Sequence, residues 1–308
     1  MKIAFFTEGG YQGKVPRNNQ NMRTELAWMC ALDADHYNIN ADIPKYSDRY
    51  DLGIVIIPKK NPQFDLERIK KWCSKVASMQ EGPHWYFQDY PLEQQIWFYN
   101  TLMDMDFLFV HNEIDKKYFE GLTGKDCKIM PSLMIEDSIN FPKLNRSNVM
   151  IGGNFCQWYG GFDSYITAQE FDCPIYAPSM GRKIENEHWM DGLKHLPYMN
   201  WVEWIKKLNT FKYGVHLMRT HAAGTFALNC AYLGIPCIGY EGLDTQMKCH
   251  PDCTVELGDI TKAKQIAKKL RKDEEFYLYC SNIAKESYKK YYHENQFYNS
   301  IKEQLKIS

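Results

Sequence analysis

Short apolar runs and longer amphipathic runs alternate along this sequence, and the alternation strongly limits the folds open to the chain. Apolar runs that predict buried strands cover residues 2–7, 52–58, 84–88, 107–111 and 127–130. Helical patterns separate them at 22–32, from Asp65 to about 78, at 92–102 and at 115–122. A β–α–β order of this kind predicts a parallel sheet with helices on both faces.

Residues 131–147 break the pattern with prolines, serines and an asparagine, and they are interpreted as a linker. Predicted strands then resume at 149–152, 174–176, 213–218 and 235–239, with helices at 162–171, after Asn200 to 208, and at 259–270. Residues 273–305 carry only helical patterns. The 308-residue chain is therefore expected to form an α/β domain over 1–140, a second over 148–290 and a terminal helical segment over 291–308.

The segment 221–239 is the most specific part of the sequence. A tight turn at Gly224 precedes a short helix, Gly234 ends that helix, and an apolar strand follows. A helix that begins at Gly224-Thr225 directs free backbone N–H groups at whatever lies in front of it, which is a ready site for an anion. The alternative is an ordinary helix–strand unit of a parallel sheet.

The same segment resembles the signature of retaining glycosyltransferases with the GT-B fold, the family-four group. Gly224, Gly234 and Pro236 match the signature, whereas His221 and Asn229 replace its two glutamates. In that family, the first glutamate contacts the donor sugar and the second holds the ribose of the nucleotide. The resemblance implies two Rossmann-like domains that face each other across a cleft, with the acceptor in the first, the nucleotide sugar in the second, and the last helix crossing back to the first.

The resemblance also assigns residues to the donor. Asn229 would hold the ribose hydroxyls, since a carboxamide both donates and accepts hydrogen bonds. The helix start at Gly224, Thr225 and Phe226 would bind the diphosphate. The loop after the second domain's first strand supplies cations in the family but has none here over 154–161. Arg219 is the first candidate replacement, and Arg182 with Lys183 is the second. Each could instead be an ordinary surface cation.

In the first domain, Gly10 and Gly13 lie in a glycine-rich loop after the first predicted strand. Such a loop allows close approach of backbone to the reacting sugar, or else is a flexible turn. Asp89 follows the predicted strand 84–88 and is the first candidate for the general base; related phage enzymes carry a His-Asp pair there, with Gln88 at the histidine position. Asp89 could equally cap the following helix. His111 and His221 are the next catalytic candidates.

These residues predict a hexosyltransferase that moves a sugar from a nucleotide-diphosphate sugar, expected to be a UDP-sugar such as UDP-glucose, to a hydroxyl. No metal or other cofactor is expected, because a helix N-terminus and side-chain cations can offset the phosphate charge. Trp158 and Asp89 resemble residues of phage DNA glucosyltransferases and favour a hydroxymethylated DNA base as acceptor. The alternatives are a cell-surface glycan as acceptor, or a degenerate, non-catalytic two-lobed protein that binds a nucleotide sugar.

Composition limits the other classes of protein to which the chain could belong. The net charge is −1, which gives no support to nucleic-acid binding, and only Lys14, Arg17, Arg23, Lys59 and Lys60 could line a duplex from loops of the first domain. No apolar run approaches the roughly 18 residues of a membrane span, and the first apolar run is short for a signal peptide. Ten cysteines occur without a Cys-x-x-Cys pair, and Cys249-His250-Pro251-Asp252-Cys253 has poor spacing for zinc. Reduced thiols and a cytoplasmic location are expected.

Overall fold

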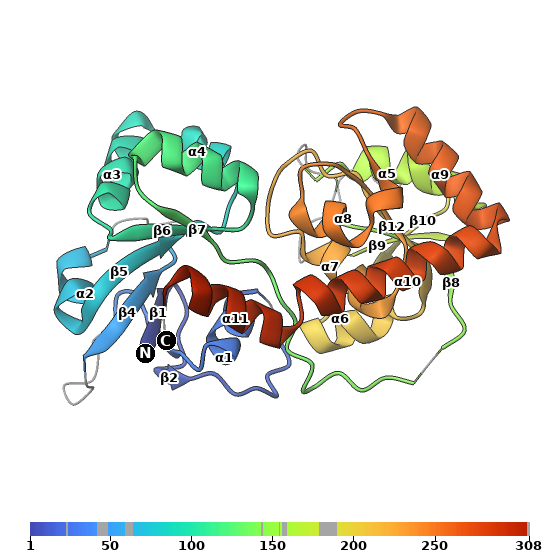
Figure 1. Cartoon of the computed structure of the whole chain (residues 1–308). Helices are drawn as coiled ribbons and strands as arrows, with labels where there is room; N and C mark the ends of the chain where they lie inside the picture. The colour runs from blue at the N-terminus through green and yellow to red at the C-terminus, as the bar shows by residue number, and fades with distance from the viewer. Residues whose placement is uncertain are drawn as a thin grey trace. The chain divides into compact units, whose positions relative to one another are not determined.

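The computed structural model describes residues 1–22, 24–41, 49–58, 64–142, 144–153, 155, 159–178 and 190–306, with the backbone alone at 86–88. The chain forms two compact units, each built on its own sheet (Figure 1). The first unit comprises Met1–Asn19, Arg23–Ile135 and Glu294–Ser308, and the second comprises Gln20–Met22 and Glu136–His293.

The first unit contains a seven-stranded sheet in the order β2-β3-β1-β4-β5-β6-β7, and only the β2–β3 pair is antiparallel. The strands are β1 (Ile3–Thr7), β2 (Gly13–Lys14), β3 (Asp35–Asn38), β4 (Tyr50–Val55), β5 (Cys73–Met79), β6 (Phe107–Val110) and β7 (Cys127–Ile129). The helices are α1 (Thr24–Ala31), α2 (Leu66–Trp72), the 3-10 helix η1 (His84–Asp89), α3 (Leu92–Met103), α4 (Glu113–Thr123) and α11 (Glu294–Gln304). Every residue of β1 is buried, as a central strand covered on both faces requires.

The strand predicted at 84–88 is wrong. Asp65 caps α2 as predicted, but the helix ends at Trp72, and Cys73–Met79 continues as β5 between β4 and β6. The apolar residues of β5 suit a helix or a strand by local pattern, and pairing on both sides decides for the strand. With that place in the sheet taken, His84–Asp89 forms η1 beyond the end of β5.

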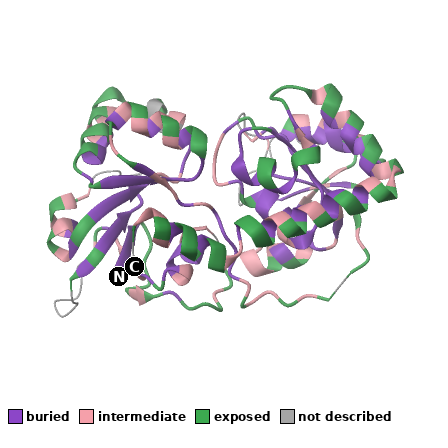
Figure 2. Cartoon of the chain, in the orientation of Figure 1, coloured by how far each residue is buried: buried purple, intermediate pink, exposed green. Residues whose placement is uncertain are grey.

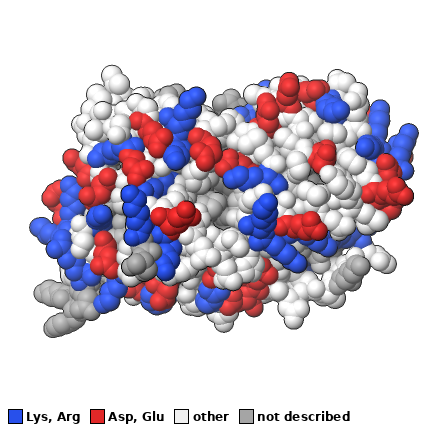
Figure 3. Space-filling view, in the orientation of Figure 1, with Lys and Arg blue, Asp and Glu red and all other residues white. Residues whose placement is uncertain are grey.

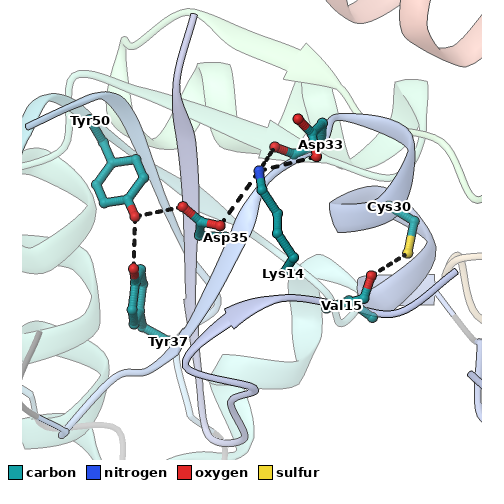
Figure 4. Close-up of polar contacts among 7 residues, drawn as sticks. All are labelled: Lys14, Val15, Cys30, Asp33, Asp35, Tyr37 and Tyr50. Atoms are coloured by element: carbon teal, nitrogen blue, oxygen red, sulfur yellow. Dashed lines mark hydrogen bonds and ion pairs between the residues drawn. The ribbon is translucent and has the colours of Figure 1, made fainter. Parts of the chain in front are cut away.

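The short antiparallel pair of β2 and β3 at the edge of this sheet was not predicted. Lys14 of β2 lies opposite Asp35 of β3, with its Nζ 3.5 Å from Asp35 Oδ1 and 3.1 Å from Asp33 Oδ1 (Figure 4). The Tyr50 hydroxyl donates to Asp35 Oδ2 at 2.7 Å. Lys14 is therefore paired with two carboxylates, so it adds little net positive charge to the loop cations considered for a duplex acceptor.

The second unit contains a six-stranded, all-parallel sheet in the order β10-β9-β8-β11-β12-β13. Its strands are β8 (Ser147–Ile151), β9 (Ile175–Pro178), β10 (Leu193–Leu196), β11 (Phe211–His216), β12 (Cys237–Tyr240) and β13 (Thr254–Val255). Its helices are α5 (Gly161–Ala168), η2 (Gln169–Phe171), α6 (Trp201–Leu208), α7 (Thr225–Leu233), α8 (Asp244–Cys249), η4 (Pro251–Cys253), α9 (Ile260–Lys272) and α10 (Glu274–Tyr291). Helix α7 packs against α8 and α10, whereas α5 packs against α9.

The capping residues and glycines predicted from the sequence mark helix ends of this unit correctly. Asn200 forms a capping box with Glu203 at the start of α6, and Asp259 caps α9. Gly224 and Gly234 bracket α7, both with left-handed backbone conformations. The short elements β10, α8 and β13 were missed, because runs of so few residues carry little periodicity.

The terminal helix α11 belongs to the first unit, as expected. Phe297 and Ile301 are buried, and Arg17 forms two 2.8 Å bonds with the Glu294 carboxylate. The Gln304 amide accepts from the Ile129 N–H at 2.8 Å and donates to the Ile129 carbonyl at 2.9 Å. A side chain thus satisfies the backbone groups at the edge strand β7.

Candidate functional site

The carboxyl edge of the second sheet brings together two loop–helix junctions. Gly152 follows β8, and a Cβ there would lie 2.6 Å from His216 Cγ at the end of β11 and 2.7 Å from Phe226 Cδ1 of α7. Gly160, before α5, would place a Cβ 1.8 Å from the Leu217 carbonyl. Glycine is needed at both positions because backbone and rings approach this closely. The loops after adjacent strands β8 and β11 therefore meet where parallel sheets bind ligands.

Helices α5 and α7 both begin here without a side-chain cap. Their N-cap residues, Gly160 and Gly224, have left-handed φ values of 62° and 64°. Asp or Asn side chains cap α2, α4, α6, α9 and α10. The first-turn N–H groups of α5 and α7 are thus left for another acceptor, and the helix dipoles favour an anion there.

Asn229 lies one turn after Thr225 on the same face of α7. Helical side chains lean toward the N-terminus of their helix, so the Asn229 amide extends toward the start of α7. Asn229 is only 6% exposed, and its amide forms no hydrogen bond within the described part of the chain. The amide atoms remain accessible to solvent, so their hydrogen-bonding capacity is available to a ligand at the start of α7.

Arg219 lies past the end of β11 and is held in front of α5. Its Nη2 and Nε donate to Asp163 Oδ2 at 2.8 and 3.2 Å, and the Tyr240 hydroxyl donates to the same oxygen at 3.1 Å. Because Asp163 lies in the first turn of α5, the guanidinium is fixed beside that helix start. Its Nη1 has no partner among the residues that the structure describes. The carboxylate offsets part of the positive charge, so Arg219 contributes a directed donor more than net charge.

His216 is a residue of this edge that the sequence analysis missed. It is the last residue of β11, whereas the predicted strand 213–218 placed it mid-strand. Its ring lies against Tyr159 and Phe226, with ring centroids 6.5 and 5.3 Å away. Burial lowers the pKa of His216 to about 4, so the ring is neutral near pH 7 and fills the space that Gly152 leaves.

His221 also reaches this edge. A Cβ on Gly242, in the loop after β12, would lie 2.2 Å from His221 Nε2, so the imidazole rests on that glycine. The remaining predicted donor residues, Arg182 and Lys183, are outside the described residues. The structure thus gathers Arg219, Thr225, Phe226 and Asn229 with His221 around the starts of α5 and α7.

The first unit holds a separate pocket of about 160 Å³ at the carboxyl edge of its own sheet. Thr7, Glu8 and Gly9 come from the end of β1, Ile56, Ile57 and Pro58 follow β4, Glu81 follows β5, and Glu25 comes from α1. Three carboxylates therefore border a pocket with an apolar wall. Gly10 does not line it; a Cβ on Gly10 would lie 2.5 Å from the Asn38 N atom. Gly13 lies in β2, not in the predicted loop.

Two predicted catalytic residues have other positions than expected. Asp89 is exposed at the end of η1 and follows no strand, and the N-cap of α3 is Pro91, so Asp89 does not cap that helix either. His111 is buried after β6, with its Nε2 3.1 Å from the Glu81 carbonyl and its ring 5.3 Å from Trp28. His111 therefore supports the segment that carries Glu81 and does not face solvent.

The cysteine-rich segment 249–253 is structural. His250 Nε2 donates to the Ala227 carbonyl at 2.9 Å, and its Nδ1 accepts from the Cys237 N–H at 3.4 Å, so both ring nitrogens are engaged with the backbone. Over the described ranges, no group of three or more His, Cys, Asp or Glu residues could hold a metal ion, and the nine cysteines there are free. None of the described helices combines the length and apolar character needed to cross a bilayer.

No family model matches the sequence, and no curated protein matches it closely enough to count as a relative. Solved structures are similar. The Anabaena Alr3699/HepE protein in complex with UDP and glucose matches at a TM-score of 0.67 and 10% identity over 100% of each chain. Sucrose-phosphate synthase from Thermosynechococcus elongatus matches at 0.65 and 9% identity, over 99% of this chain and 98% of that one. The trehalose-6-phosphate synthase OtsA matches at 0.63 and 11% identity, over 83% and 72%.

The chain spans only 57% and 55% of the length of two other matches, from the GtfA/B complex and TarM. All five structures are GT-B glycosyltransferases, so the chain has the GT-B fold that the 221–239 segment predicted. They give no support to the more specific likeness to phage DNA glucosyltransferases.

Proposed function

We propose that this protein is a glycosyltransferase that moves a hexosyl group from a UDP-sugar to a hydroxyl acceptor. The observation that carries the proposal is the Asn229 amide, which lies one turn behind the uncapped start of α7 and has no hydrogen-bond partner among the described residues. The GT-B fold supports it, since HepE has that fold and was solved with UDP and glucose.

The donor residues have distinct roles in this proposal. The first-turn N–H groups of α7 and α5 bind the diphosphate, and Arg219 donates from its Nη1. Asn229 bonds the ribose hydroxyls. His221, which stands where the family has a glutamate, contacts the transferred sugar. The anomeric carbon exchanges its bond to the phosphate oxygen for a bond to the acceptor oxygen, and the proton of the acceptor hydroxyl passes to the departing phosphate. These N–H groups and Arg219 stabilise the negative charge that develops on the departing UDP.

The acceptor binds the first unit's pocket in this proposal. The carboxylates of Glu8, Glu25 and Glu81 accept hydrogen bonds from hydroxyls and repel phosphates. Lys14 and Arg17, two of the cations considered for a duplex, are engaged by Asp33 and Glu294, and Arg23, Lys59 and Lys60 lie outside the described residues. The pocket therefore favours a hydroxyl-rich glycan acceptor over a hydroxymethylated base in DNA.

Release of UDP from a panel of UDP-sugars, with and without glycan acceptors, tests the proposal. Turnover is expected, and it should persist in a chelator because the helix N-termini offset the phosphate charge and Arg219 adds a directed hydrogen-bond donor. Activity that a chelator abolishes and manganese restores would contradict this metal-independent account. Tight UDP binding with no release from any sugar would instead favour a degenerate nucleotide-sugar-binding protein.

A further inference from the structure

Helix α3 of the first unit has two apolar faces. Phe98 and Leu102 are buried against the unit. On its other side, Leu92, Ile96, Tyr99 and Met103 are 70%, 53%, 37% and 38% exposed. Figure 2 shows exposed residues along the outer side of α3. A helix that covers a sheet needs only the first of these faces, so the outer row calls for a separate explanation.

The outer row forms one straight stripe. Its members are separated alternately by four and three positions, which places them above one another on a helix. This is the spacing of the apolar seam by which two helices pack side by side. The stripe is therefore shaped for another helix.

The charges around the stripe argue against a membrane as its partner. Helix α3 contains no lysine or arginine, and Glu93 is its only charged residue. Figure 3 shows no blue or red surface over the outer part of α3, at the upper left. A helix that lies on an anionic lipid surface carries cations beside its apolar face, and α3 has none.

The spacing of the stripe residues, four, three and four positions, is the same in either direction along the helix. If a second α3 packs antiparallel about a two-fold axis, Leu92 meets Met103 of the second copy, and Ile96 meets Tyr99 of the second copy. Beside this seam, Gln95 faces Asn100 of the second copy, so no like charges are opposed. An apolar row that complements itself in this way is what an isologous contact requires.

The ends of α3 are complementary as well. Pro91 provides no side-chain cap at its N-terminus, and the exposed Asp104 follows its C-terminus. An antiparallel pair places Asp104 of each copy beside the positive N-terminal end of the other helix and aligns the two helix dipoles favourably.

We propose that the protein forms a homodimer through a two-fold, antiparallel contact between the α3 helices of two copies. The contact uses only the outer face of α3, so it stands or falls independently of the proposed glycosyl transfer.

Sedimentation velocity of the whole chain across the micromolar range tests the dimer. Wild type is expected to sediment as a dimer, and Ile96→Glu as a monomer with an unchanged circular dichroism spectrum, since an exposed side chain is replaced. Leu278→Glu is the matched control, because Leu278 is a 51% exposed leucine on α10 of the second unit, and it should remain dimeric. A monomeric wild type, or Ile96→Glu that remains a dimer, would overturn the proposal.

Cysteine cross-linking with copper-phenanthroline as oxidant tests the register. A mixture of Ile96→Cys and Tyr99→Cys chains should form mixed disulfide dimers several-fold faster than either variant alone, with wild type as the background for native cysteines. Faster cross-linking of Ile96→Cys alone would contradict the antiparallel arrangement. Flotation with phosphatidylcholine–phosphatidylglycerol vesicles that Ile96→Glu abolishes, without any dimer, would replace the second copy by a lipid surface.

Discussion

At the scale of single residues, the described part of the second unit contains polar groups that are hydrogen-bonded and others that are not. His250 has both ring nitrogens bonded to the backbone, and Asp163 accepts from Arg219 and Tyr240. Both ring nitrogens of His216 are buried without a partner, and the 6% exposed Asn229 also makes no hydrogen bond to the described residues. Because the Asn229 amide is accessible to solvent and the His216 ring is not, Asn229 is the one of these two groups that we propose a ligand bonds.

Asn229→Ala should weaken UDP binding by about 1–2 kcal/mol, because one or two hydrogen bonds to the ribose are lost. Isothermal titration calorimetry measures the change. Asn282→Ala, an exposed asparagine on α10, is the matched control and should bind UDP as wild type does. Equal affinities in both variants would remove the ribose role from Asn229.

Asp89→Asn should leave turnover close to that of wild type. Asp89 is exposed at the end of η1 and does not line the first unit's pocket, whereas removal of a general base would cost roughly 10²–10⁴ in kcat. Steady-state UDP release by the two proteins decides the matter. A loss in that range, with folding intact, would restore Asp89 as the base.

At the scale of elements, the start of α7 depends on one glycine. Gly224 has a φ of 64°, and its carbonyl accepts a hydrogen bond from the Thr245 hydroxyl at 3.0 Å. A Cβ on Gly224 would lie 2.0 Å from Thr245 Oγ1. Thr245 belongs to α8, so the position of α7's first turn is set by contact with the next helix. The N–H groups proposed to bind the diphosphate are positioned by this junction.

Gly224→Ala should lower the free energy of unfolding by about 1–3 kcal/mol and weaken UDP binding, because left-handed strain is added to the clash with Thr245. Gly121→Ala in α4 is the control: no atom lies within 4 Å of its added Cβ, and a helical alanine is favoured. Adding Thr245→Ala to Gly224→Ala should recover part of the stability. Urea unfolding and calorimetry report the two effects, and a Gly224→Ala protein that matches wild type in both would contradict this account.

At the scale of the whole molecule, folding keeps three histidines neutral, one in the first unit and two in the second. Burial lowers the pKa of His36 in the first unit, and of His216 and His250 in the second, to about 4. The unfolded chain takes up protons near the ordinary histidine pKa of about 6.5, whereas the folded chain resists protonation until about pH 4. Between these values the unfolded state binds more protons, so stability rises with pH.

The free energy of unfolding should therefore be largest above about pH 6.5 and should fall as the pH decreases toward 4. Denaturant unfolding of the whole chain at a series of pH values measures this fall. The free energy of unfolding of His250→Gln, whose amide can still donate to the Ala227 carbonyl, should depend less steeply on pH, because one group with a lowered pKa is removed. A dependence as steep as that of wild type would show that His250 is not protonated on unfolding in this range.

The sequence by itself determined what neighbours along the chain decide. The strand–helix alternation predicted two parallel-sheet units, and Asp65, Asn200, Asp259, Gly224 and Gly234 marked helix ends correctly, because capping and left-handed turns depend on a few adjacent residues. The signature spacing of 221–239 also predicted the GT-B fold.

Only the tertiary structure decided which apolar run enters a sheet and which polar groups meet at its edge. Cys73–Met79 became β5 in place of the run at 84–88 because it pairs with strands on both sides, a non-local gain that local pattern cannot show. The contacts of Arg219 with Asp163 and of His216 with Phe226 join residues far apart in sequence. The pocket bordered by Glu8, Glu25 and Glu81 exists for the same reason, since each carboxylate comes from a different element and only the sheet aligns them.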